Sequence, residues 1–124
     1  MPCRGYLPHV KLAVESILNQ TYQDFEFLII NDASEAPVRE YFEGLRDSRI
    51  QILHHETPLG VSRSLNKGLR LIQSEIVLRM DSDDIARSDR IELQCGHLMR
   101  HPEITVLGGQ IQNMRGDGRS TQVP

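Results

Sequence analysis

The sequence is poor in cysteine, in long apolar runs and in excess positive charge. Its two cysteines, Cys3 and Cys95, lie far apart and form no CxxC pattern, which is typical of a reduced, intracellular protein. No apolar run approaches the roughly 18 residues of a membrane span, and the first ten residues lack the plan of a signal peptide. Lysine and arginine number 14 against 17 aspartates and glutamates, so the net charge of −3 gives no reason to expect nucleic-acid binding.

What remains is the composition of one globular domain. Hydrophobic residues make up 39% and charged residues 25% of 124 positions, which excludes a disordered chain. The length allows a real core but is short for a complete enzyme with two substrates.

Helical spacing of apolar residues alternates along the chain with β-rich runs. Helices are expected over Leu7–Gln20, Pro37–Arg46, Val61–Ile72 and Ser88–Arg100. Strands are expected over Phe25–Ile30, Ile50–Leu53, Ile76–Met80 and Ile104–Leu107. This alternation predicts an α/β fold, with flanking helices on a mostly parallel, twisted sheet.

Acidic side chains follow two of the expected strands. Asp32 comes after "FEFLII", and Asp81, Asp83 and Asp84 come after "IVLRM". Ligands of parallel α/β sheets bind beyond the carboxyl ends of the strands, so these carboxylates are candidates for a site. The alternative is structural, because aspartate and serine are also ordinary turn and helix-cap residues. For Asp84, capping of the next helix is as good an interpretation as chemistry.

Four segments in series carry a resemblance to a known family. They are "MPCRGYLPHVKLAVESILNQ", "FEFLIINDAS", "PLGVSRSLNKGL" and "MDSDDIARSDRIELQ". Together they resemble the family 2 inverting glycosyltransferases of GT-A fold, over nearly the whole chain and in the right order. The resemblance implies a Rossmann-like nucleotide-sugar-binding domain over residues 1–115, truncated at both ends, with a loose tail at 116–124. It also implies that the first strand is largely missing from the middle of the sheet, which predicts marginal monomer stability or a homodimer.

The resemblance implies a donor site as well. The residues that would border the nucleotide are Pro2, Arg4, Asp32, Arg63 and Asp81. Asp83 would be the direct metal ligand, with Asp81 nearer the ribose or a metal-bound water. A donor diphosphate cannot approach these acids unaided, because unit charges ~4 Å apart interact by roughly 4 kcal/mol at an effective dielectric near 20. A bound Mn²⁺ or Mg²⁺ would turn this repulsion into attraction, and both ions prefer oxygen ligands.

The activity implied is metal-assisted transfer of a sugar, with inversion, from a nucleotide-diphosphate donor to an acceptor hydroxyl. A UDP-sugar is the expected donor, because Asp32 matches the acid that accepts from the base ring. The acceptor would be a saccharide or a lipid-linked sugar, and the location cytoplasmic or peripheral at the inner face of the membrane. Inverting transfer needs a general base, and no residue of this chain can be assigned that role.

Several alternatives stay open. The chain is either such a donor-binding half or a non-catalytic nucleotide- or metal-binding remnant of the same fold. A receiver-like or phosphatase-like domain would use the acids with Mg²⁺, but it lacks a nucleophilic aspartate after the first strand. Cys95, His97 and His101 form a weak zinc candidate without an evident fourth ligand. Arg63 is as good a solvated helix residue as a phosphate contact, and His54-His55 is interpreted as a loop pair.

Overall fold

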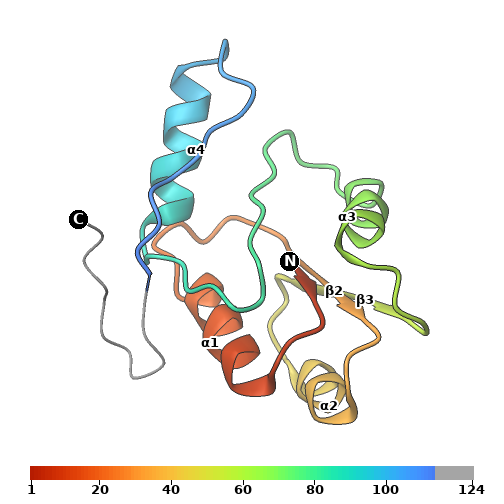
Figure 1. Cartoon of the computed structure of the whole chain (residues 1–124). Helices are drawn as coiled ribbons and strands as arrows, with labels where there is room; N and C mark the ends of the chain where they lie inside the picture. Colours follow the sequence, from red (N-terminus) through yellow and green to blue (C-terminus); the bar gives the residue numbers. More distant parts are fainter. Residues whose placement is uncertain (114–124) are drawn as a thin grey trace.

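A computed structural model describes residues 1–113 of the chain. The centre is a three-stranded parallel sheet in the order β1-β2-β3, formed by β1 (Pro2–Cys3), β2 (Phe27–Asp32) and β3 (Ile50–His55). Four helices accompany it (Figure 1): α1 (Leu7–Leu18), α2 (Ala36–Gly44), α3 (Val61–Leu69) and α4 (Arg90–Arg100). The sequence-based expectation of an α/β fold with a parallel sheet is therefore confirmed.

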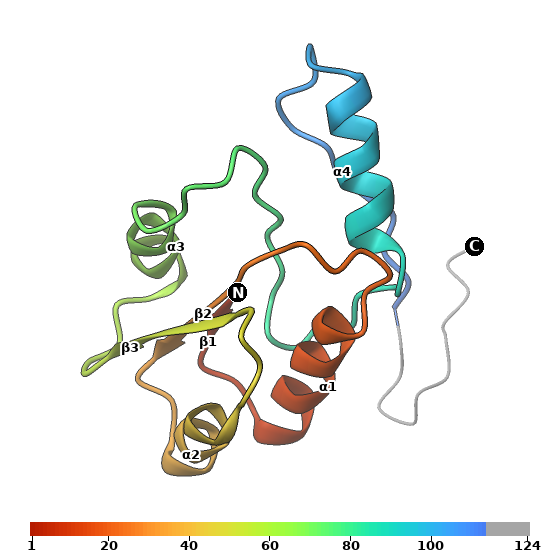
Figure 2. The same ribbon diagram turned by 180° about the vertical axis from the view of Figure 1, so that it is seen from behind.

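The side chains of β2 alternate between two packed faces. Phe27 and Ile29 join a core with α1 and α2, which lie below the sheet in Figures 1 and 2. α1 contributes apolar residues at helical spacing, and they are Val10, Ala13, Val14 and Ile17. α2 contributes Val38 and Phe42.

The opposite face of β2 packs on α3, which lies above the sheet in both views. α3 can approach β2 closely because the residues that it buries, Ser64 and Gly68, are small. A Cβ on Gly68 would lie 2.6 Å from Cδ1 of Ile30, so the helix backbone sits almost directly on that side chain.

α4 stands above α1 in both views and is joined to it through the loop that precedes α4. The Thr21 N–H donates to the Ser88 carbonyl over 2.8 Å, and the Ala86 N–H donates to the Ser16 hydroxyl over 3.0 Å. Met80 and Ala86 also belong to the core that Phe27 and Ile29 form with α1 and α2. No helix within residues 1–113 has both the length and the apolar character needed to cross a bilayer.

Two expected strands do not form. The segments 76–80 and 104–107 have no strand assignment. A strand needs a neighbour to complete its hydrogen-bond ladder. β1 is only two residues long, so it offers no edge to 76–80, and Val106 in the second segment is 85% exposed. Both strand predictions are wrong for this structure, and the expected tail at 116–124 lies outside the described residues.

Helix ends also differ from expectation. The residue before α3 is Gly60, so the start of this helix has no side-chain cap. α4 begins at Arg90 after Asp89, which leaves Asp84 well before the helix and rules out its capping role. The expected strand Phe25–Ile30 is shifted toward the C-terminus as β2, because Phe27 is the first residue to pair with Ile50 of β3.

Candidate functional site

Asp32 ends β2 and anchors the loop before α3. Its Oδ1 accepts the Leu59 N–H over 2.8 Å and lies 3.0 Å from Nδ1 of His55, while its Oδ2 accepts the Gly60 N–H over 2.8 Å. Because a carboxylate can only accept, His55 donates from Nδ1. Burial alone would raise the pKa of Asp32. The hydrogen bonds from His55, Leu59, Gly60 and Ser64 outweigh that burial and lower the pKa to about 2.

His55 is a part of this arrangement that the sequence interpretation missed. His54 and His55 are not a loop pair, because they are the last residues of β3, paired with Asn31 and Asp32. His55 is 6% exposed, and its Nε2 is buried without a hydrogen-bond partner among the described residues. His54 instead contacts the Asn31 amide, with 3.0 Å between Nδ1 and Nδ2. The sequence signal that could have found His55 is a histidine that follows one expected strand while an aspartate, Asp32, follows the strand before it.

Gly60 has a backbone that only glycine adopts freely, with φ of 81° and ψ of 165°. We expect Gly60→Ala to lower the free energy of unfolding by about 1–2 kcal/mol and to disturb the N–H that Asp32 accepts. Urea unfolding would measure the change. Gly44→Ala is the matched control, because a Cβ there meets nothing within 4 Å, and its stability should stay level or rise slightly. Equal losses in the two variants would contradict the strain at Gly60.

The acids after segment 76–80 lie in a turn. The Asp84 N–H approaches the Asp81 carbonyl at 3.4 Å. Asp81 is held by its neighbour Arg79, whose Nη2 donates to both carboxylate oxygens at 2.6 and 2.8 Å. Both side chains are substantially exposed, so this pair adds little to stability. Asp83 is exposed and free of any ion pair within residues 1–113. Arg90 donates from Nη2 to the Arg79 carbonyl over 2.8 Å, so it supports this turn through the main chain.

One pocket gathers most of the residues proposed from the sequence. It has a volume of about 480 Å³ and lies at the carboxyl ends of β1 and β2. Its lining includes Pro2, Arg4, Asp32, Asp81 and Asp83. Arg63 does not line it, and α3 contributes Val61 instead. Tyr6 and His9, which the sequence interpretation did not include, line the same pocket with their rings in edge contact, 5.5 Å between centroids.

The donor set of this pocket suits a hard divalent cation in kind, because Asp81 and Asp83 bring carboxylate oxygens to one space. Within residues 1–113 no three histidine, cysteine, aspartate or glutamate side chains are grouped to hold a metal. An ion at these two acids would therefore have to take its other ligands from water or from a bound phosphate.

The zinc candidate has no such donor set. The rings of His97 and His101 lie together with 4.5 Å between centroids, but His101 has Glu103 3.2 Å from its Nδ1. Cys95 is buried in α4, and burial raises the pKa of its thiol, which disfavours the thiolate that zinc needs.

Solved structures share this fold. A crystal structure of S. aureus TarS matches 82% of this chain and 31% of that chain, with a TM-score of 0.74 and 21% identity. The mannosyltransferase PcManGT from Pyrobaculum calidifontis, in complex with GDP-Man and Mn²⁺, matches 74% of this chain and 28% of that chain, with a TM-score of 0.63 and 23% identity. The chain thus has the fold of the GT-A class.

Comparison of sequences identifies the family within the GT-A fold class to which the chain belongs. The model of glycosyl transferase family 2 matches residues 1–123. A Haemophilus influenzae protein named an uncharacterized glycosyltransferase is 34% identical over 106 residues, which are 84% of this chain and 33% of that relative. The chain belongs to glycosyl transferase family 2, and it spans about a third of the length of the first relatives it matches.

Proposed function

We propose that this chain forms the donor-binding half of a glycosyltransferase that moves a sugar, with inversion and metal assistance, from a nucleotide diphosphate to an acceptor hydroxyl. The observation that carries the proposal is the pocket that brings the main chain after β1, Asp32 of β2 and the Asp81–Asp83 turn to one space. Three segments distant in the sequence converge there, at the sheet edge where α/β folds bind ligands.

Charge decides how a diphosphate could enter. Asp81 and Asp83 repel it, whereas Arg4 and Arg79 of the same pocket attract it. Asp83 is the proposed direct ligand of Mn²⁺ or Mg²⁺, since it is exposed and carries no ion pair among the described residues. Asp81 must first exchange its contact with Arg79, which frees the guanidinium for phosphate. When bound, the ion would supply the positive charge that stabilises the departing diphosphate.

Pro2 and Arg4 would border the base, and Asp32 would face it from the end of β2. Its oxygens accept from the N–H groups of Leu59 and Gly60 and from His55, so it is held as a carboxylate that can only accept. By resemblance Asp32 matches the acid that accepts from the base ring, as from the N3–H of uracil, so a UDP-sugar is the proposed donor. PcManGT is a mannosyltransferase solved with GDP-Man, which makes GDP the comparison to test against UDP.

The acceptor proposed is a saccharide or lipid-linked sugar, met in the cytoplasm or at the inner face of a membrane. No residue in the described part of this pocket is assigned the role of the general base that inverting transfer needs. The Arg79–Asp81 pair also favours a second candidate, a non-catalytic remnant, because it neutralises one acid without a metal.

Thermal melts with Mn²⁺, UDP and both together separate these candidates. Ligand that binds only the folded chain stabilises it by about 2.7 kcal/mol at a hundredfold excess over the dissociation constant. We expect UDP to raise the melting temperature only with Mn²⁺ present, and Asp83→Ala to remove this effect. Asp84→Ala is the matched control, since Asp84 is equally exposed, adjacent and outside the pocket lining. If Asp83→Ala responds to Mn²⁺ and UDP as the parent chain does, the acids are turn residues and the donor-site proposal fails.

A further inference from the structure

α3 carries a row of positive side chains along one face. Arg63, Lys67 and Arg70 are spaced by four and three residues, and Arg70, the C-cap, keeps helical dihedral angles of φ −74° and ψ −17°. At about 100° per residue the three positions fall within about 60° of arc, over about 10 Å of helix. We call these three side chains the basic ridge.

The basic ridge is not neutralised by its own chain. Residues 57–74 contain these three cations and no aspartate or glutamate, although the whole chain has a net charge of −3. All three residues are exposed, and none has an ion pair or a side-chain hydrogen bond within residues 1–113. Like charges four residues apart destabilise a helix slightly, so the stability of α3 does not explain this row.

The other cations of the described chain have partners, with the exception of Arg4, which lines the pocket of Asp32 and Asp83. Several are paired with carboxylates, and these are Arg39, Arg49, Arg79 and Arg87. The rest donate to main-chain carbonyls or lie over a tyrosine ring, and these are Arg46, Arg90, Arg100 and Lys11. In this part of the chain, the basic ridge is therefore where positive charge gathers without a protein partner.

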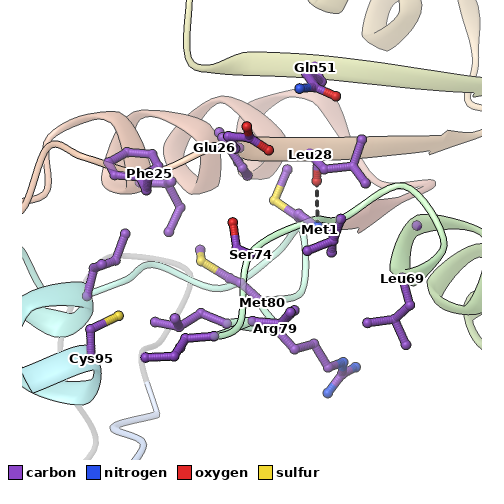
Figure 3. A pocket seen from close by; sticks show the side chains of 18 of the residues that line it. Met1, Phe25, Glu26, Leu28, Gln51, Leu69, Ser74, Arg79, Met80 and Cys95 are labelled. Carbon is purple, nitrogen blue, oxygen red and sulfur yellow. Dashed lines mark hydrogen bonds between the residues drawn. The ribbon is translucent and has the colours of Figure 1, made fainter. Parts of the chain in front are cut away.

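The basic ridge lines neither cavity of the described structure. The pocket of Asp32 and Asp83 takes Val61 from α3. A second cavity, of about 570 Å³, lies on the side of β2 that α3 covers, and Figure 3 shows Leu69 of α3 among the side chains that line it. α3 itself lies at the periphery of the molecule in Figures 1 and 2. The basic ridge is thus accessible to a partner with a large surface.

Charge is distributed unequally over the two faces of the sheet. The basic ridge lies on the α3 face, whereas the exposed Glu40 and Glu43 belong to α2, on the opposite face. A flat anionic surface would attract the first face and repel the second, which would turn α3 toward it. Leu69 and Leu71, at the end of the basic ridge, are each 53% exposed, and such apolar side chains can enter a lipid headgroup region.

We propose that the basic ridge docks this chain on an anionic membrane surface, with α3 lying along the lipid headgroups. A membrane offers negative charge over the whole length of the ridge, whereas a single phosphate reaches only part of it. The proposal rests on the membrane location proposed above and names the surface that would produce it. Because Val61 at the start of α3 lines the pocket of Asp32 and Asp83, docking would bring that pocket close to the headgroups, where a lipid-linked acceptor is held.

Sedimentation of the full chain with lipid vesicles tests the proposal. The parent chain should bind vesicles of equal parts phosphatidylcholine and phosphatidylglycerol, bind pure phosphatidylcholine vesicles far less, and lose this difference as the salt concentration rises. The double variant Lys67→Ala with Arg70→Ala should bind the mixed vesicles roughly thirtyfold more weakly, since each cation near such a surface contributes about fivefold. Alanine is a strong helix former, so the variant should keep α3. The matched control is Arg46→Ala with Arg100→Ala, which removes the same charge from exposed positions outside α3 and should bind like the parent chain.

Three results would overturn the proposal. They are equal binding, or none, to the two kinds of vesicle, equal weakening in the two double variants, and an affinity for polyglutamate or duplex RNA that depends on the ridge and exceeds the affinity for the mixed vesicles. The last result would assign the basic ridge to an acidic protein or to nucleic acid. The donor-site proposal is checked separately, by the rise in melting temperature with Mn²⁺ and UDP, which the variant at Lys67 and Arg70 should retain.

Discussion

Replacing Gln20 with alanine is expected to lower the free energy of unfolding by roughly 3 kcal/mol. Gln20 is 1% exposed at the end of α1. Its Nε2 donates to the Ser16 carbonyl over 2.9 Å and to the Arg87 carbonyl over 2.7 Å. Its Oε1 accepts the Ile91 N–H over 2.9 Å, which satisfies one of the free donors in the first turn of α4.

The loss would come from the groups that Gln20 leaves behind. Alanine leaves the buried Ile91 N–H and the partly buried Arg87 carbonyl without their partner, and an unsatisfied buried group costs about 1–3 kcal/mol. Urea unfolding followed by circular dichroism would measure the change. Gln20→Met retains the volume without the hydrogen bonds and should lose nearly as much. Gln73→Ala, at an exposed position, should stay within about 0.5 kcal/mol of the parent chain. Parent-like stability of Gln20→Met would show that the hydrogen bonds matter little.

The second large effect is expected at Asp32. Asp32→Asn keeps the shape of the side chain but turns one acceptor into a donor that faces the Leu59 or Gly60 N–H. Charge-assisted hydrogen bonds contribute about 1.5–3 kcal/mol each, so we expect a loss of roughly 3 kcal/mol at pH 7. Asp24→Asn, on an exposed side chain, is the control and should be near neutral.

The pKa of Asp32 determines how the stability difference between the parent chain and Asp32→Asn changes with pH. The folded-state pKa of Asp32, about 2, lies below the value of 3.8 for an unperturbed aspartate. The ionised carboxylate therefore stabilises the fold fully above about pH 4, and this contribution is lost as the pH falls toward 2. The stability difference between the parent chain and Asp32→Asn should shrink over that interval. Asp47, whose pKa the side chain of Arg49 lowers to about 2, is present in both proteins and cancels. A difference that stays constant down to pH 2.5 would contradict the assignment.

Sequence patterns predicted what local spacing determines. The four helices follow from apolar residues three and four apart, as in Val10, Ala13, Val14 and Ile17 of α1. The pocket could be predicted from Asp32 at the carboxyl end of a parallel strand, and Asp81 and Asp83 line the same pocket although the segment before them forms no strand. Both inferences use only the order of residues along the chain.

What the patterns missed depends on distant partners. Ile76–Met80 has the composition of a strand, yet a strand also needs a neighbour, and β1 ends before it can serve. Gln20 resembles any polar residue at a helix end, and only the fold brings Arg87 and Ile91 to it. Arg63 was placed at the phosphates by resemblance, whereas the first turn of α3 presents Val61 to the pocket.

The Asp32 carboxylate also bears on the order of events in folding. It joins residues that lie 23, 27 and 28 positions further along the chain. The entropy cost of closing loops grows slowly with length, so closing the first of these loops covers most of the cost of the other two. β2, β3 and the beginning of α3 are thus tied to a single closure event. Segments on either side, such as α4, can attach only after a surface to receive them exists.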